Sequence, residues 1–431
     1  MKYLIRGGRV ISPADKIDGE LDILISGGKI EKTGKGLTEK SDKVIDAGGK
    51  IVTPGLIDMH THLREPGRED KETVASGTRA AVRGGFATVA CMPNTEPAID
   101  SPETVKILKD IIEKDALCNV AIVGAITVDR EGKKIADFAD MKRSGAIAVS
   151  DDGSSVEDKK LMCDALKSAK INGILVIEHC EDTKLSALGV INKGFVSTKM
   201  GLRGISGRSE YERIKRDIEL AEKCASRIHI AHVSCKESVE IIRKAKRTGV
   251  KVTAETAPHY FALTEDCCVT YDTHTKMNPP LRTKEDVEAI KKGLADGTID
   301  AIATDHAPHT DSEKDVEFDL APFGIIGLET ALSIAVTELI EKKVLSWSEL
   351  IEKMSLNPAK ILGLKTPSLK KEALADIAII DPQKEYIYSK ASIESKSKNS
   401  PFIDWRLKGK VTDLFVGGNL VMENEVIKGR K

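Results

Sequence analysis

Hydrophobic and polar positions follow two different rhythms along the chain. Near both ends, short alternating runs rich in β-branched residues are interrupted by Gly-Gly pairs, as in residues 3–11, 21–30, 43–50 and 411–421. Gly-Gly between such runs is typical of β-hairpins. Because neither end is long enough for a robust core of its own, we predict one composite β-sandwich domain from residues 1–53 and 366–431.

The middle of the chain alternates short apolar runs with longer amphipathic segments. We count eight runs, at residues 51–63, 87–94, 119–127, 146–153, 173–181, 227–234, 252–260 and 301–309. Helix-like stretches lie between them, at residues 101–115, 156–171, 209–225, 236–248 and 283–295. This alternation predicts an α/β fold, a parallel (β/α)₈ TIM barrel over residues 54–365. A doubly wound open sheet is the alternative, but no G-x-G-x-x-G follows an early strand.

Composition narrows the class of protein. Of 431 residues, 66 are Lys or Arg and 67 are Asp or Glu, so the net charge of −1 disfavours a general nucleic-acid binder. No run approaches the ~20 apolar residues of a membrane span, and the N-terminus does not resemble a signal peptide. The 8 cysteines lack CxxC spacing, so we expect reduced thiols in a cytoplasmic protein. Residues 390–400 are rich in Ser and Lys, and we expect a solvated loop there.

Most histidines fall at the ends of the apolar runs, where a barrel of this kind carries its active site. His60 and His62 are two residues apart, so on a strand they point to the same side and suit one metal ion. Taken alone, such a pair is equally often a coincidence. His179 ends the fifth run.

Two further runs offer pairs of which one member can face inward. In His229-Ile-Ala-His232 we choose His232, which is nearer the carboxyl end, and expect His229 to be a packing or hydrogen-bonded residue. In the last run we choose Asp305 over His306, because a carboxylate can both bind a metal and relay a proton.

The fourth run ends in Asp151-Asp152-Gly153, which by itself is more often a turn. Beside the histidines, however, a carboxylate there could bridge two metals. Four histidines and two aspartates on five strand ends would hold two divalent ions.

Four motifs resemble the dihydroorotase family, most closely its longer-chain type within the amidohydrolase superfamily of metal-dependent hydrolases. They are Gly-Leu-Ile-Asp-Met-His-Thr-His-Leu-Arg-Glu-Pro-Gly at 55–67, Cys-Met-Pro-Asn at 91–94, Lys-Met-Asn-Pro-Pro-Leu-Arg at 276–282 and Ala-Thr-Asp-His-Ala-Pro-His-Thr-Asp-Ser-Glu-Lys at 303–314. The resemblance covers the whole chain, including the composite β domain.

The resemblance implies two zinc ions per chain. One ion would be bound by His60, His62 and Asp305, and the other by His179 and His232. Residues 146–153 contain no lysine that could carry the carboxylate bridge of many relatives, so Asp152, with a water or hydroxide, would bridge the ions. Asp151 is the alternative bridge.

The resemblance also implies a binding site for an anionic substrate. Arg64 can fork onto a carboxylate, whereas hydantoinases act on rings without that group. The implied substrate contacts are His62, Arg64, Asn94, Asn278, His309 and the backbone of Pro322-Phe323-Gly324. Turn, loop or surface roles are the alternatives for Asn94, Asn278 and His309.

The activity implied is dihydroorotase: the reversible cyclisation of N-carbamoyl-L-aspartate to (S)-dihydroorotate with loss of water, in pyrimidine (UMP) biosynthesis. A zinc-activated hydroxide would attack the cyclic amide, with Asp305 as catalytic acid and base. The polar residues 310–319 would form either a lid or an ordinary loop. The alternatives are another cyclic amidohydrolase, such as an allantoinase or hydantoinase, and a non-catalytic scaffold for aspartate carbamoyltransferase. A homodimer and an association with that enzyme both stay open.

Overall fold

The larger domain is built around eight parallel strands that follow the eight apolar runs. In the computed structural model, which describes residues 1–429, the sheet order matches the chain order. A bridge between Thr61 and His306 joins the first strand to the last segment, and the His62 amide donates to the His306 carbonyl at 2.9 Å. The predicted barrel is therefore confirmed and the open sheet is excluded. The strands are β6 (Leu56–Thr61), β7 (Phe86–Cys91), β8 (Asn119–Gly124), β9 (Ala146–Val149), β10 (Leu175–Glu178), β13 (Ile228–Ile230), β14 (Val252–Thr256) and β15 (Ala301–Ile302).

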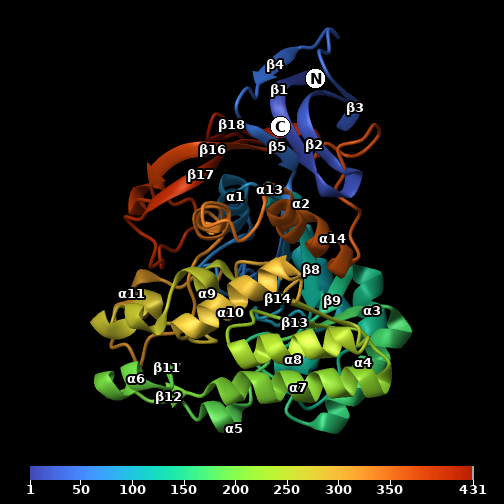
Figure 1. Cartoon of the computed structure of the whole chain (residues 1–431). Helices are drawn as coiled ribbons and strands as arrows, with labels where there is room; N and C mark the ends of the chain where they lie inside the picture. Colours follow the sequence, from blue (N-terminus) through green and yellow to red (C-terminus); the bar gives the residue numbers. More distant parts are fainter. Residues whose placement is uncertain (430–431) are drawn as a thin grey trace.

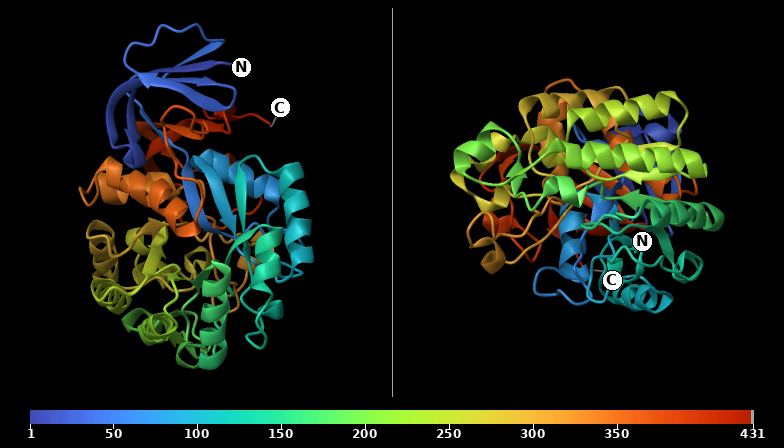
Figure 2. Two further views of the ribbon diagram at one scale, coloured as in Figure 1. Left: turned by 90° about the vertical axis from the view of Figure 1, so that its right-hand side faces the viewer. Right: turned by 90° about the horizontal axis from the view of Figure 1, so that it is seen from below.

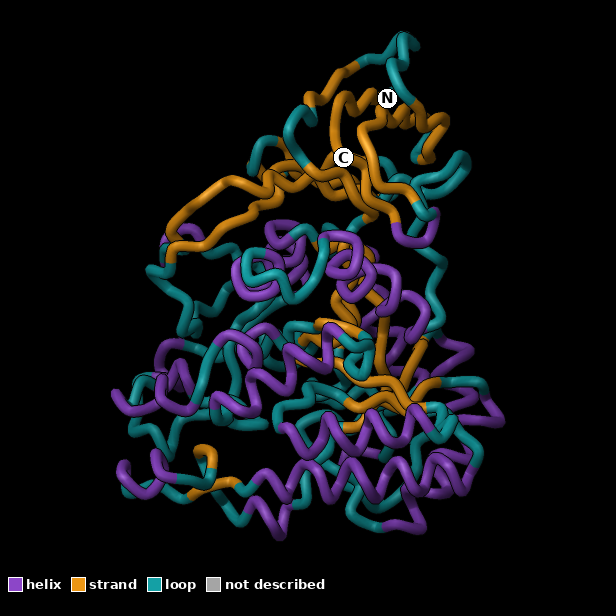
Figure 3. The backbone as a smooth tube through the Cα atoms, in the orientation of Figure 1, coloured by secondary structure: helices purple, strands orange, loops and turns teal. Residues whose placement is uncertain are grey.

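Helices surround these strands, as the tube drawing shows (Figure 3). Their ends follow local sequence signals; in α2, for example, Ser101 caps the Thr104 amide and Pro102 occupies the first turn. All five predicted helical stretches are present, with ends shifted by up to three residues. The main helices are α1 (Val74–Gly84), α2 (Pro102–Asp115), α3 (Phe138–Ser144), α4 (Lys159–Asn172), α7 (Gly207–Cys224), α8 (Lys236–Arg247), α10 (Lys284–Ala295), α12 (Ala331–Ala335), α13 (Trp347–Ile351) and α14 (Asn357–Leu362).

Short elements lie in the loops between strands and main helices. After β10 the chain forms α5 (Thr183–Ser186), β11 (Ile191–Asn192), α6 (Phe195–Met200) and β12 (Gly204–Ile205). After β14 it forms α9 (Pro258–Ala262), and after β15 it forms α11 (Asp311–Lys314). In α11, the buried Lys314 donates to the carbonyls of Thr273 and Pro322, so residues 310–319 are tied to neighbouring loops at that point.

Both termini contribute to one mixed sheet above the barrel, coloured blue and red (Figures 1 and 2). Within residues 1–429 this sheet has nine strands, and β5 joins the two halves by pairing with β1 and with β16. The composite β domain expected from the sequence is thus present. The strands are β1 (Tyr3–Ser12), β2 (Ile17–Ser26), β3 (Lys29–Gly34), β4 (Lys43–Asp46), β5 (Ile51–Pro54), β16 (Ile377–Ile387), β17 (Arg406–Val416), β18 (Asn419–Glu423) and β19 (Val426–Ile427).

Two local expectations were wrong. Two of the Gly-Gly pairs do not form hairpins. β1 continues through Gly7-Gly8, and the register against β2 shifts between Ile5 and Gly8, as in a β-bulge. Gly48-Gly49 lies between β4 and β5, which both pair with β1 in parallel and not with each other. Residues 390–400 are not simply a solvated loop, because Ser395 and Asn399 are at most 1% exposed. Their hydroxyl and amide groups bond to the barrel, which compensates for their burial.

No helix among residues 1–429 is long and apolar enough to cross a membrane.

Candidate metal centre and substrate pocket

Six side chains expected from the sequence converge at the carboxyl ends of the barrel strands. His60 Nε2 lies 3.2 Å from Asp152 Oδ1, and His62 Nε2 lies 2.9 Å from Asp305 Oδ1. On the other side, His232 Nε2 lies 3.6 Å from the same Asp152 oxygen. The residues brought together are His60, His62, Asp152, His179, His232 and Asp305.

The cluster has the chemistry of a metal site. Two groups, His60–His62–Asp305 and His60–Asp152–His232, each offer ligand atoms within 4.8 Å of one another. His60 Nε2 and Asp152 Oδ1 are buried and have no hydrogen-bond partner among residues 1–429. Buried nitrogen and oxygen lone pairs that face one another are costly unless a cation lies between them, so these residues fit a divalent metal.

His179 completes the cluster at its second edge. Its Nδ1 lies 2.8 Å from His232 Nε2 and 3.9 Å from Asp152 Oδ1. Although burial opposes it, the surrounding histidines hold the pKa of the Asp152 carboxyl well below its usual range. Asp152 is therefore an anion, as a bridging ligand must be.

In each pair of candidate residues at a strand end, only one side chain faces the cluster. Asp152 faces the histidines, whereas Asp151 accepts hydrogen bonds from the amides of Ile126 (2.9 Å) and Thr127 (3.0 Å). Asp151 thus holds a neighbouring loop, and the geometry favours Asp152 as the residue facing the centre.

Likewise, only one residue of each candidate pair faces the cluster on the last strand and on β13. Asp305 faces the cluster, whereas His306 Nε2 lies 3.3 Å from Glu72 Oε2. His232 faces inward, and His229 lies beside Thr253, 2.8 Å from its hydroxyl. His229 is thus a buried hydrogen-bonded residue, as expected.

Three site residues have left-handed backbone conformations, namely Arg64 (φ 61°), His232 (φ 33°) and Asp305 (φ 49°). Such conformations are unfavourable for residues with a Cβ, and they concentrate at functional sites. Here each one lies at or just beyond the end of a strand, where the chain bends and turns a side chain toward the centre.

Sequence reasoning missed Glu255, a buried residue of β14. Its Oε1 accepts from His60 Nδ1 at 2.7 Å, and its Oε2 lies 3.3 Å from His229 Nε2. Burial opposes ionisation, but the hydrogen bonds from His229 and His60 lower the pKa of Glu255 to about 2. This carboxylate fixes the His60 ring with Nε2 toward the cluster. A lone acid in an apolar strand was the available signal.

The expected anion pocket lies beside the cluster. The Arg64 guanidinium donates to the Pro308 carbonyl at 3.3 Å and approaches His309 Nε2 at 3.5 Å. Among residues 1–429 no carboxylate forms an ion pair with Arg64. Burial lowers its pKa to about 10, so it stays charged at neutral pH. This cation is available to a bound anion.

His309 is held in a neutral form. Its Nε2 donates to the Phe323 carbonyl at 2.8 Å, and its Nδ1 accepts from Lys71 Nζ at 3.2 Å. Burial and the cations Arg64 and Lys71 lower the pKa of His309 to about 2.

Gly324 has φ 121°, and a Cβ there would lie 2.7 Å from the Ala307 Cβ. Glycine therefore allows the 323–324 backbone to approach His309. Lys71, which pairs with Glu313 at 2.8 Å, was not anticipated.

The two asparagines expected to contact substrate bond to the cluster in this structure. Asn94 Oδ1 lies 2.7 Å from His62 Nδ1. Asn278 Nδ2 donates to Glu181 Oε2 at 2.8 Å, and that oxygen lies 3.1 Å from His179 Nε2. Both amides thus help to orient histidines, and Glu181 is a further residue that the sequence did not reveal.

The same fold occurs in solved structures of hydantoinases. Solved structures with the same arrangement include L-hydantoinase (dihydropyrimidinase) from Arthrobacter aurescens, with a TM-score of 0.90, 23% identity and coverage of 99% of this chain and 97% of the other. D-hydantoinase from Thermus sp. has a TM-score of 0.86 and 24% identity over 100% and 97% of the two chains.

Sequence comparisons narrow the class. A family model described as "Dihydro-orotase-like" matches residues 49–238. The dihydroorotase of Elusimicrobium minutum is 55% identical over 428 residues, 99% of both chains. That of Pelotomaculum thermopropionicum is 52% identical over 429 residues, 99% of this chain and 100% of its own. The chain therefore belongs to the dihydroorotase family, which confirms the resemblance found in its motifs.

Proposed function

We propose that this chain catalyses the reversible cyclisation of N-carbamoyl-L-aspartate to (S)-dihydroorotate, the dihydroorotase step of pyrimidine (UMP) biosynthesis. The supporting observation is the position of Arg64, which has no carboxylate partner among residues 1–429, beside a buried cluster of histidines and aspartates. A cyclic amide with a carboxylate needs both features, whereas a hydantoin ring needs only the cluster.

We assign two zinc ions to the cluster. His60, His62 and Asp305 would bind one ion, His179 and His232 the other, and Asp152 both. When bound, such ions would lower the pKa of a shared water and polarise the amide carbonyl.

Asp305 carries the proton chemistry in this proposal. In ring opening, its carboxylate accepts the proton that the attacking water loses and donates it to the ring nitrogen as the C–N bond breaks. In ring closure the carbamoyl nitrogen forms the C–N bond, and Asp305 carries its proton to the departing oxygen. His62 Nε2 lies 2.9 Å from Asp305 Oδ1 and keeps this carboxylate in position.

The remaining pocket residues bind and orient the substrate. Arg64 would hold the substrate carboxylate through charge-assisted hydrogen bonds, with His309 and Asn94 beside it. The backbone of residues 323–324 and Asn278 would contact the ring. Fixing both ends of the substrate places the amide carbon beside the cluster.

The absence of disulfides among the described residues supports a reducing compartment. No disulfide joins two cysteines among residues 1–429, which favours the cytoplasm as the place where the enzyme acts.

The test is turnover of dihydroorotate and carbamoyl aspartate before and after a chelator, with hydantoin and allantoin as comparison substrates. We expect activity on the first pair only, loss on chelation, recovery with zinc, and about two ions per chain by metal analysis. Asp305→Ala should keep the fold and lose several orders of magnitude in kcat. Faster turnover of hydantoin would contradict the substrate assignment. Fewer than one bound ion per chain, without turnover, would support the scaffold alternative.

A further inference from the structure

A segment of the terminal domain reaches the rim of the substrate pocket. Residues 393–400, here called the strap, lie between β16 and β17 and run back over the barrel. Within the strap, Asn399 is 1% exposed. No sequence motif had pointed to this segment as part of the site.

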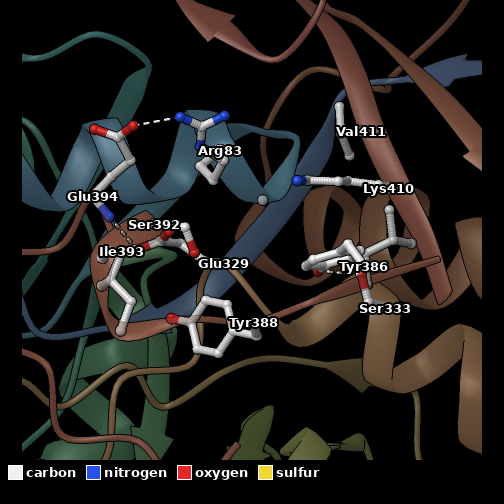
Figure 4. A pocket seen from close by; sticks show the side chains of 13 residues that line it. Arg83, Glu329, Ser333, Tyr386, Tyr388, Ser392, Ile393, Glu394, Lys410 and Val411 are labelled. Carbon is white, nitrogen blue, oxygen red and sulfur yellow. Dashed lines mark hydrogen bonds and ion pairs between the residues drawn. The ribbon is translucent and has the colours of Figure 1, made fainter. Parts of the chain in front are cut away.

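The strap is anchored to the barrel at its beginning. Figure 4 shows Glu394 paired with Arg83 of α1, with Glu329 lying beneath the strap. Glu329 Oε1 accepts from the backbone amides of Glu394 (2.9 Å) and Ser395 (3.1 Å). The course of the strap is thus set before it reaches the pocket.

At its other end, Asn399 connects two loops of the pocket. Its Oδ1 accepts from the His309 amide at 3.1 Å, and its Nδ2 donates to the carbonyls of Ala307 and Gly324, each at 3.1 Å. Its own carbonyl accepts from the Ile326 amide at 2.9 Å. Every polar atom of the side chain is used, and each bond ends on backbone beside His309 or Gly324.

We propose that Asn399 is a positioning residue for recognition of the substrate carboxylate. It sets the distance between the 307–309 loop, which carries His309, and the 323–324 backbone. His309 Nε2 already lies 2.8 Å from the Phe323 carbonyl, so a small separation of the loops would move the ring away from Arg64. This inference rests on the proposed function, because it assumes that Arg64 and His309 together bind the substrate carboxylate.

Two variants separate the bonds that Asn399 makes. Asn399→Ala removes all three side-chain bonds. Asn399→Asp keeps the acceptor for the His309 amide but turns a carboxylate oxygen toward two carbonyls. The matched control is Asn357→Ala, since the Asn357 amide donates to the Asp300 carbonyl (2.9 Å) at the opposite end of β15.

The measurements are kcat and KM for dihydroorotate, and the inhibition constant of dihydrouracil, a similar ring without the carboxylate. We expect Asn399→Ala to raise KM about tenfold, the effect of weakening one charge-assisted contact, with the dihydrouracil constant unchanged. Asn399→Asp should raise KM at least as much, and Asn357→Ala should leave both constants unchanged. A melting temperature for each variant accompanies the kinetics.

The outcomes are distinguishable. Wild-type KM in both Asn399 variants would overturn the inference, as would a parallel rise in KM and the dihydrouracil constant, since a purely structural role affects both ligands. If Asn399→Ala does not fold, the KM of the nearly isosteric Asn399→Asp variant decides whether the inference holds. Absence of turnover by the wild type would instead remove the proposed function, and this inference with it.

Discussion

Glu255 offers a sharp test of how the barrel orients its metal ligands. The carboxylate is buried in β14 and accepts from His60 Nδ1 at 2.7 Å. Because this bond places the Nδ1 proton, His60 Nε2 is left as a lone pair toward Asp152 and Asp305. Glu255→Gln keeps the size of the side chain and removes its charge.

The magnitude follows from the type of hydrogen bond that changes. A bond to a charged group contributes about 1.5–3 kcal/mol and a neutral one about 0.5–1.5 kcal/mol. Glu255→Gln therefore costs about 1–1.5 kcal/mol in ligand orientation, or roughly a tenfold weaker metal affinity. Glu255→Ala removes the bond entirely, and the loss should lie near the upper end of the roughly 10–100-fold range for such supporting groups.

The assay is metal titration of the apo-enzyme against a competing chelator, with activity recovery followed in parallel. Glu178→Gln is the matched control, since Glu178 is a buried glutamate of the nearby β10 and, in the part of the chain that the structure describes, neither of its oxygens has a hydrogen-bond partner. Burial raises the Glu178 pKa well above its usual value, so its substitution removes no charge. A metal affinity of Glu255→Ala within threefold of wild type would refute the orienting role.

Three further predictions test the other parts of the site and the fold. Arg64→Lys loses the guanidinium fork, so KM for dihydroorotate should rise at least tenfold in steady-state assays; an unchanged KM would exclude Arg64 from carboxylate binding. Asp152→Ala should lower the number of bound metal ions, whereas Asp151→Ala should lower the melting temperature and leave metal content intact; the reverse pattern would exchange their roles. Burial raises the pKa of Glu329 from 4.5 to about 7, so its contribution to stability is fully present below pH 4.5 and lost as the pH rises through 7. Glu329→Gln should therefore melt close to wild type at pH 5 and above it at pH 8, and equal melting temperatures at both pH values would contradict this.

The barrel could be predicted because each strand is marked twice, by an apolar run and by the polar residues that end it. The alternation of side chains along a strand predicted that only one member of each pair faces inward; His232 was chosen because it lies nearer the carboxyl end, and Asp305 because a carboxylate can bind a metal and relay a proton. Both choices agree with the geometry, although His232 and Asp305 lie beyond the last strand residues, Ile230 and Ile302, and it is the left-handed backbone at these two residues that turns them toward the centre.

Contacts between distant segments could not be predicted in the same way. The Ser- and Lys-rich composition of residues 390–400 suggested solvent, yet Asn399 is buried because backbone groups of two other loops satisfy its amide. In the sequence, Lys71 likewise resembles an ordinary surface lysine, but in the structure it contacts Glu313 and His309. Composition reports the solubility of a segment, but not the partners that the fold brings to it.

The site separates charges that the whole-chain balance of −1 conceals. Asp152, Asp305 and Glu255 concentrate negative charge among the histidines, where a metal would compensate it. At the rim, Lys71 is paired with Glu313 and His309 is neutral, so Arg64 supplies the available positive charge. If a substrate carboxylate competed for the cluster, it would displace the reacting amide. Arg64, as a separate cation at the rim, binds the carboxylate away from the cluster and orients the ring. The distance between Arg64 and the cluster therefore decides which substrates place their amide at the cluster.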